Sequence, residues 1–329
     1  MASFHEKDSE PLDNTSSKLY YPNSGNPLDE LLNLCKDDNN YQKVKDFVRA
    51  NGSMSGHGND KTRYKIKLNI NNKSNSGETV LMVACSFGAK DIAKYLISLE
   101  ADVNKFNKTD GKTALSWASE YGHQKVVRLL LDANAEVDKA YVYFSGNTPL
   151  MQACIRGHAK CVEMLLQANA AVDKVNNWGR TPLVAAIDHG HIEVVRLLLK
   201  WSADVDKLVD GQTPLMIAEG RYPIVEELVK HNADVNKVDK LGNTALILAC
   251  IYNCLVTIRG RHCSIGGEKD CKKVVEILAF GSGANLDIFN NDGMDAISMA
   301  EDKGNMEVVD ILMEAIEAQG GGHIGNDED

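Results

Sequence analysis

Residues 172–205 read VDKVNNWGRTPLVAAIDHGHIEVVRLLLKWSADV, and close copies of this segment recur along the chain. Each copy contains a short motif that opens on Thr or, once, on Asp, and these motifs start at Thr79, Thr113, Thr148, Thr181, Thr213, Thr244 and Asp295. Successive starts are 34, 35, 33, 32, 31 and 51 residues apart. A period near 33 residues indicates a stack of small supersecondary units and not one globular core. The sequence therefore predicts a repeat solenoid.

One copy shows how its residues specify local structure. Asn176–Gly179 is typical of a tight turn, in which Gly179 supplies a backbone conformation that most residues avoid. Thr181 is suited to cap the N-terminus of a helix, and Pro182 fits the first helical position. Gly190 ends this helix, and a second helix carries Ile192, Val194, Val195, Leu197, Leu198 and Leu199. This second helix is too apolar to stand in water alone, so neighbouring copies must cover it on both sides.

These residues resemble the ankyrin repeat, whose pattern is D-x-x-G-x-T-P-L-H-x-A-A followed by G-H, V-V, L-L and A-D-V-N. The resemblance covers residues 26–316, and the A-x-V-[DN] closers recur at Val103, Val137, Val172, Val205 and Val235. It implies an all-α repeat solenoid of about eight repeats, each with paired antiparallel helices and a β-hairpin-like loop.

The chain departs from this pattern at two positions. The His of T-P-L-H is replaced throughout, by Met82, Ser116, Met151, Val184, Met216, Ile247 and Ser298. In the family that His joins hydrogen bonds between neighbouring loops, so we expect those loops to be held less rigidly here. The Gly before A-D-V-N is mostly Asn, at positions 134, 169 and 232, and Asn is the next-best residue for a left-handed helix end.

The domain organisation follows from where the period is interrupted. The spacing of 51 residues places an insertion at about 255–271, between the two helices of one repeat, and a second insertion occupies about 51–66. We expect the solenoid to span 26–317. Residues 1–25 and the acidic segment 318–329 have the composition of disordered tails.

Composition limits the function classes. The net charge of -10 argues against a general nucleic-acid or anionic-membrane binder. No apolar run approaches the ~20 residues of a membrane helix, and the N-terminus lacks the apolar core of a signal peptide. Cys85, Cys154 and Cys250 each follow the opening Thr of their repeats by six residues, which indicates packing positions and not disulfide partners. Reduced thiols favour a cytoplasmic or nuclear location, and we expect a monomer.

The sequence offers candidate residues for two kinds of chemical site, a zinc site and a catalytic site. Cys250, Cys254, His262, Cys263 and Cys271 are residue types that bind zinc, but their spacing matches no common zinc finger, and free thiols in a loop are the alternative. No phosphate loop, zincin motif or nucleophile elbow is present. The histidines at the G-H position of the repeat are His123, His158 and His191, and we expect them to be structural. The sequence thus predicts no cofactor, no metal and no catalysis.

The resemblance implies protein–protein recognition. Family partners lie along the hairpin tips and the exposed side of the first helix. Those positions here are Tyr121, Phe144, Ser145, Asn147, Ile155, Arg156, Asn177, Trp178, Arg180, Asp188, His189, Lys240 and Tyr252. Aromatic and Arg side chains are the types that anchor interfaces. The alternative is that Tyr141, Tyr143 and Phe144, in a longer hairpin, cover only their own repeat.

An adaptor, scaffold or inhibitor is the function expected from this surface. The alternative is the substrate-recruiting subunit of an enzyme complex such as a ubiquitin ligase or a phosphatase, which a short recruiting motif in a tail or insertion would favour; none is visible in the sequence. The resemblance also implies asparagine hydroxylation at Asn104 and Asn236. Each has a Leu eight residues before it, Leu96 and Leu228.

Overall fold

The computed structural model of the chain describes residues 27–51, 69–140, 145–218, 220–252 and 268–320. Within these ranges it contains sixteen α-helices, one short 3-10 helix at Asp38–Asn40 and no strand. The helices are α1 Pro27–Leu34, α2 Tyr41–Asn51, α3 Val80–Ser86, α4 Lys90–Ser98, α5 Ala114–Glu120, α6 Gln124–Asp132, α7 Pro149–Ile155, α8 Ala159–Gln167, α9 Pro182–Asp188, α10 Ile192–Lys200, α11 Pro214–Ile217, α12 Tyr222–Lys230, α13 Ala245–Tyr252, α14 Glu268–Gly281, α15 Ala296–Asp302 and α16 Met306–Gly320.

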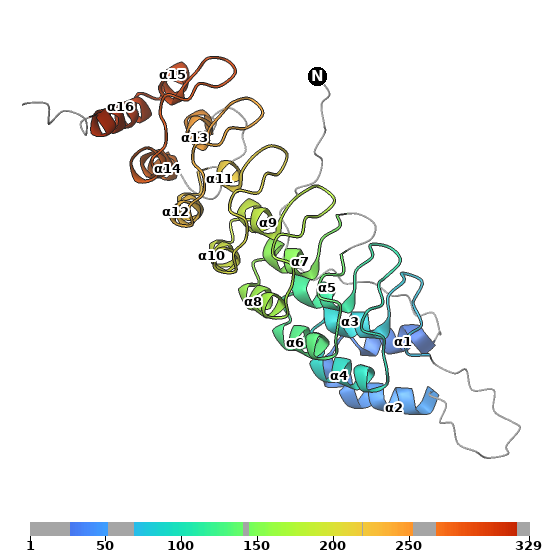
Figure 1. Cartoon of the computed structure of the whole chain (residues 1–329). Helices are drawn as coiled ribbons and strands as arrows, with labels where there is room; N and C mark the ends of the chain where they lie inside the picture. The colour runs from blue at the N-terminus through green and yellow to red at the C-terminus, as the bar shows by residue number, and fades with distance from the viewer. Residues whose placement is uncertain (1–26, 52–68, 141–144, 219, 253–267, 321–329) are drawn as a thin grey trace, which may run out of the picture.

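The helices form two parallel rows, as Figure 1 shows. The odd-numbered helices make one row and the even-numbered helices the other, and the loops that precede the odd-numbered helices project beside the first row. Extensive contacts occur only within a helix pair or between adjacent pairs; α7, for example, packs on α5, α8 and α9. This is the stacked arrangement that the repeat period predicts, and it confirms the solenoid.

The first helix of each pair begins at the residue that the sequence predicts. Thr181 Oγ1 accepts a hydrogen bond from the backbone N–H of Val184 at 3.2 Å, and Asp295 caps α15 in the same way. At two of the positions where the family's His is replaced by Met, the sulfur takes part in the cap: Met82 Sδ accepts from the N–H of Thr79, and Met216 Sδ from that of Thr213, both at 3.4 Å. These two caps therefore have two hydrogen bonds each without an imidazole.

The core is continuous along the stack. Val194, Val195 and Leu198 on the second helix are buried, as the apolar pattern of that helix predicts. The cysteines at the packing position, Cys85 and Cys154 among them, are also buried and free, which confirms that they pack in place of forming disulfides. Because each pair contributes only part of the core, the neighbouring pairs complete it.

Histidine rungs join successive repeats at the G-H position. His191 Nε2 donates to the carbonyl of Ile155, the last residue of α7, at 2.9 Å. The matching rungs run from His123 to Ser86 and from His158 to Glu120. Gly157, at φ +71°, makes room for the His191 ring, since a Cβ there would lie 2.6 Å from the ring. These histidines are therefore structural, as expected.

Two elements depart from the regular repeat. Helix α11 has four residues where the first helices α3, α5, α7 and α9 each have seven, and Arg221 stands at the His position and donates to the carbonyl of Asp188 at 3.3 Å. The preceding hairpin is a two-residue turn with positive φ at Asp210 and Gly211, the geometry that an Asp-Gly pair favours. This repeat therefore offers its neighbours a shorter first helix.

Three of the second helices end as the sequence predicts, whereas α14 and α16 have bounds that differ from the expected ones. Asn134, Asn169 and Asn232 have φ of 58°, 62° and 62°, which confirms the left-handed helix end. Helix α16 continues to Gly320, past the expected boundary at residue 317, and α14 begins at Glu268, inside the segment expected as an insertion. None of the helices in the described ranges has the length and apolar character needed to span a bilayer.

Candidate functional site

The hairpin tips are held by side-chain hydrogen bonds to the backbone. Asn176 Oδ1 accepts from the N–H groups of Trp178 and Arg180, both at 3.0 Å, and Gly179 N–H donates to the Asn176 carbonyl at 3.0 Å. Trp178 is 59% exposed on this tip. Its backbone is fixed before any partner arrives, so little backbone entropy is lost when the indole is used for binding.

Neighbouring hairpins are joined to one another. Asn177 N–H donates to the Ser145 carbonyl at 2.9 Å, and Asn176 Nδ2 donates to Asn147 Oδ1 at 2.8 Å. Asn147 and Ser145 are buried, although their register places them among the exposed contact positions. The reason is that the next hairpin packs over them. The loops are thus tied by amide side chains in the absence of the family's His.

A cluster of charged and aromatic side chains lies at the end of α5. The Glu120 carboxylate pairs with Lys112 Nζ at 2.7 Å and with Arg156 at 3.1 Å, and its side chain is 9% exposed. Lys112 Nζ also lies 4.0 Å from the centre of the Trp117 ring, on which Tyr121 stacks with ring centres 5.8 Å apart. We call these five residues the α5 cluster. Its ion pairs link helices of adjacent repeats and fix the orientation of the side chains.

A second charged group lies at the end of α9. Arg180 forms an ion pair with Asp188, and the Asp188 carbonyl accepts from Arg221 of the next repeat. His189 is exposed, and its Nδ1 donates to the Ala185 carbonyl at 2.9 Å. Arg180 and Asp188 are thus paired within one repeat, and His189 directly follows Asp188 at the end of α9.

Asn104 and Asn236 belong to a ladder that runs along the repeats. Asn104 Oδ1 accepts from the N–H of Glu136 at 2.8 Å, and Asn236 Oδ1 accepts from the N–H of Asn285 at 2.7 Å. At the matching position of another repeat, Asp138 accepts from the N–H of Ala171. Asn and Asp can both serve here because each supplies the side-chain oxygen that accepts this hydrogen bond. Hydroxylation of the two asparagines stays a prediction.

The remaining predicted residues fall into three groups. Ile155 is only partly exposed and packs against the core, and Lys240 is exposed. Tyr252 ends α13, but its side chain lies outside the described part of the structure. The candidates that are not described at all are Phe144, Cys254, His262 and Cys263, and the side chain of Cys271 is not described either. Among the described residues, no three His, Cys, Asp or Glu side chains form a group that could hold a metal ion.

Sequence reasoning missed one set of exposed apolar residues. Val175, Leu208, Val238 and Phe289 each stand two residues after the closing Asn or Asp of a repeat, and all are 45–59% exposed. Leu241, on the tip that follows Val238, is 64% exposed. The shared register of these residues was visible in the sequence and could have identified them. With Trp178 they form a row of exposed apolar side chains along the hairpins, which we call the hairpin row.

The comparisons with known proteins agree with this geometry. A family model described as ankyrin repeats matches residues 31–141, 137–209 and 202–259. The ankyrin repeat domain of Bcl-3, described as a unique member of the IkappaB protein family, is 25% identical, with a TM-score of 0.61 over 73% of this chain and 100% of that one. The human ASB11 ankyrin repeat domain is 23% identical, with a TM-score of 0.58 over 73% and 95%.

No curated protein sequence matches the chain. The family model nevertheless covers more than half of its residues, and the helix pairs, capped first helices and hairpins of the structure are those that the model implies. The chain therefore belongs to the ankyrin-repeat family.

Proposed function

We propose that the chain is a noncatalytic binding subunit that recognises a partner protein through the hairpin row and the α5 cluster. The observation that carries the proposal is Trp178, a large aromatic side chain 59% exposed on a turn that its own hydrogen bonds hold in place. Packing within the repeat gives no reason for this exposure. Interfaces, in contrast, draw most of their energy from a few such anchors.

Two arginines that are held by ion pairs also support the proposal. Arg156 is held by Glu120, and Arg180 by Asp188, so both guanidinium groups are oriented while 34% and 46% of their side chains stay exposed. A guanidinium that is already positioned loses less side-chain entropy on binding. An Arg beside an aromatic residue is also a common composition for an interface anchor. Ankyrin repeats are generally protein–protein interaction modules, which is consistent with this proposal.

The experiment compares two exposed tryptophans on different faces. A photoreactive phenylalanine at position 178 or 201 would capture neighbours in cells, and mass spectrometry would identify proteins captured from 178 only. Their affinity is then measured for wild type, Trp178→Ala and Trp201→Ala. Trp201, at the end of α10, is 40% exposed and lies in the other row of helices.

Trp178→Ala should weaken binding by about 1–4 kcal/mol, whereas Trp201→Ala should leave it within about threefold of wild type. Arg156→Ala should weaken binding in the same assay, and Glu120 keeps Lys112 as a partner in that variant. A partner that tolerates both Trp178→Ala and Arg156→Ala, and depends on residues 51–66 or 255–271, would place the binding site elsewhere.

A further inference from the structure

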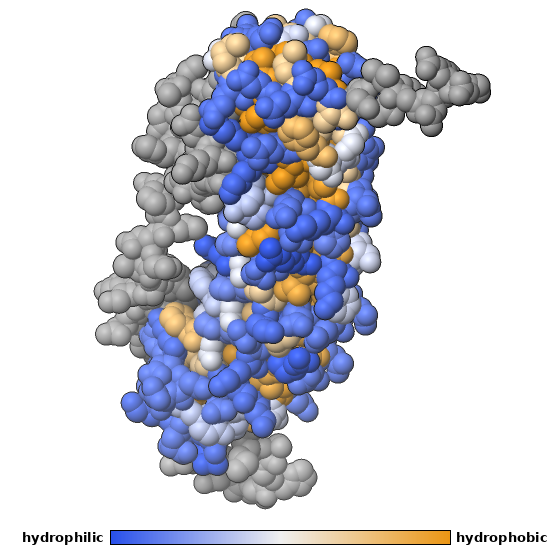
Figure 2. Space-filling view, turned by 90° about the vertical axis from the view of Figure 1, so that its left-hand side faces the viewer, coloured by the Kyte–Doolittle hydropathy of each residue, from blue (hydrophilic) through white to orange (hydrophobic). Residues whose placement is uncertain are grey.

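A groove crosses the even-numbered helices near the C-terminal end of the stack, away from the hairpins. It lies over α12, α14 and α16 and has a volume of about 570 Å³. Figure 2 looks onto this row of helices and shows apolar surface gathered toward the C-terminal end, whereas the opposite end is mostly hydrophilic. The volume falls within the range of roughly 300–1,000 Å³ of ligand-binding clefts.

Gly281 in α14 has no side chain, whereas the residues in the same register at the ends of α10 and α12 are large and the one in α16 is the buried Ala315. Gly281 stands six residues after the second valine of the Val274-Val275 pair. The same count from Val195 and from Val225 reaches Trp201 and His231. A Cβ built on Gly281 would have no atom within 4 Å. The space above α14 is therefore open to solvent.

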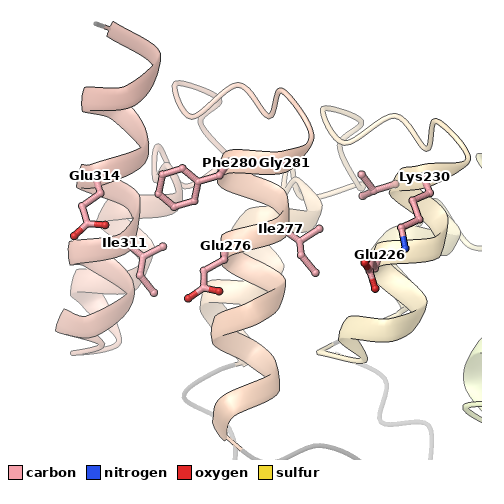
Figure 3. Close-up of a pocket in the computed structure, with 9 residues that line it drawn as sticks. Glu226, Lys230, Glu276, Ile277, Phe280, Gly281, Ile311 and Glu314 are labelled. Atoms are coloured by element: carbon pink, nitrogen blue, oxygen red, sulfur yellow. Dashed lines mark ion pairs between the residues drawn. The ribbon is translucent and has the colours of Figure 1, made fainter.

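The floor of the groove is apolar and one of its aromatic rings is exposed. Ile277 and Ile311 lie on the floor, and Phe280 is 49% exposed. Figure 3 shows the Phe280 ring directed toward α16 and Ile277 directed toward α12. Phe280 thus offers both an edge and a face to an incoming side chain.

The rim of the groove carries three carboxylates, and only one of them has a cationic partner among the described residues. Glu226 pairs with Lys230 at 2.9 Å, but Glu276 and Glu314 make no ion pair with any residue that the structure describes. The Glu276 carboxylate points to the same side as the Phe280 ring (Figure 3). A Lys or Arg side chain could lay its aliphatic stem on the floor, place its charge at these carboxylates and contact the ring face.

We propose that this groove binds a basic amphipathic helix of a partner protein, with apolar side chains on the floor and Lys or Arg at Glu276 and Glu314. Charge complementarity selects a basic partner, because the rim and the chain as a whole are acidic. Stacked helices lie about 8–10 Å apart, and residues i and i+7 of a helix are about 10 Å apart. A helix laid across α12, α14 and α16 therefore places one apolar side chain in each furrow.

The test uses a synthetic helical peptide of about 18 residues with Leu at i, i+3, i+7 and i+10 and Lys at most other positions. Binding of the fluorescein-labelled peptide to the full chain is measured by fluorescence anisotropy. One control peptide replaces Lys with Glu, and a second keeps the composition but distributes the leucines around the helix. Circular dichroism checks that each protein variant keeps its helical content.

Two kinds of protein variant separate filling of the groove from charge. Gly281→Trp fills the open space, and Gln124→Trp adds an exposed indole on α6, outside the groove. The double variant Glu276→Gln/Glu314→Gln removes the rim charges. Asp132→Asn/Glu301→Gln removes the same net charge from exposed positions elsewhere.

Wild type and Gln124→Trp should bind the basic amphipathic peptide with equal affinity. Gly281→Trp should lower that affinity about tenfold or more. The rim double variant should weaken binding several-fold and reduce its dependence on salt. Equal weakening by Asp132→Asn/Glu301→Gln, no effect of Gly281→Trp, or equal binding of either control peptide would overturn the proposal. A concentration-dependent dimer in sedimentation that Gly281→Trp abolishes would also overturn it, because the occupant would then be a second copy.

Discussion

Replacing Gly157 with alanine tests whether the histidine rungs stabilise the stack. Gly157 has φ +71°, and a Cβ there would lie 2.6 Å from Nδ1 of the His191 ring. The ring cannot stay in place, so its hydrogen bond to the Ile155 carbonyl would be lost. Gly304 occupies the same register in the last described repeat, at φ +70°, but a Cβ on it would have no atom within 4 Å. Gly304→Ala is therefore the matched control.

Both substitutions strain the backbone, but only Gly157→Ala also displaces a side chain. Both place alanine in the left-handed region, which costs about 1–2 kcal/mol and is offset by about 0.4–1 kcal/mol through the unfolded chain. Gly157→Ala also loses the rung and displaces a packed ring, and leaving a partly buried carbonyl without its partner costs about 1–3 kcal/mol. We expect Gly157→Ala to destabilise the chain by about 2–4 kcal/mol and Gly304→Ala by about 1 kcal/mol.

Urea denaturation followed by circular dichroism gives the free energy of unfolding, and hydrogen exchange gives the stability of the repeat that holds each substitution. Exchange is needed because a terminal repeat can open without the rest of the array. The double variant Gly157→Ala/His191→Ala should lose less than the sum of the single changes, since removal of the ring relieves the overlap. Equal destabilisation by Gly157→Ala and Gly304→Ala, with additive behaviour of the double variant, would refute a stabilising role of the rung.

Three further predictions concern titration, thiol reactivity and uneven stability. Burial lowers the pKa of His158, so the folded state favours the neutral ring. Stability should therefore fall as the pH drops below about 6.5. Melting temperatures should fall more steeply with decreasing pH in wild type than in His158→Gln. Burial raises the pKa of the Cys85 and Cys154 thiols, so Ellman's reagent should modify them only on unfolding, and rapid labelling of the native chain would contradict this. Segment 213–243, which contains the short α11, should exchange amide hydrogens before segment 113–202, and finding it the best protected would contradict the weakened coupling expected there.

The fold could be predicted where it depends on residues close in the chain. The capping Thr181, the turn glycine Gly179 and the left-handed Asn169 each act within one repeat, and their positions in the sequence predict their roles directly. The period then places one repeat beside the next, which is why the buried position of Cys154 was predicted as well.

The candidate site was predicted less completely because it depends on contacts between repeats. Glu120 pairs with Arg156, which lies 36 residues further along the chain. Asn147 is buried by the next hairpin. The repeat period predicts where that hairpin lies, but not which side chains it covers. The groove above Gly281 depends on three helices together. Such features depend on how the side chains of neighbouring repeats fit together. The residue at one position of the repeat does not predict that fit.

The ladder of closing Asn and Asp residues has a consequence for how such a chain can change. Each hydrogen bond of this ladder joins a side-chain oxygen of one repeat to a backbone N–H of the next, as at Asn104 with Glu136 and at Asp138 with Ala171. Almost every amino acid supplies that donor, so the junction places little demand on the sequence that follows it. A whole unit can therefore be duplicated, deleted or exchanged between arrays while the junctions on both sides stay intact, and the loop residues are left free to diverge toward new partners.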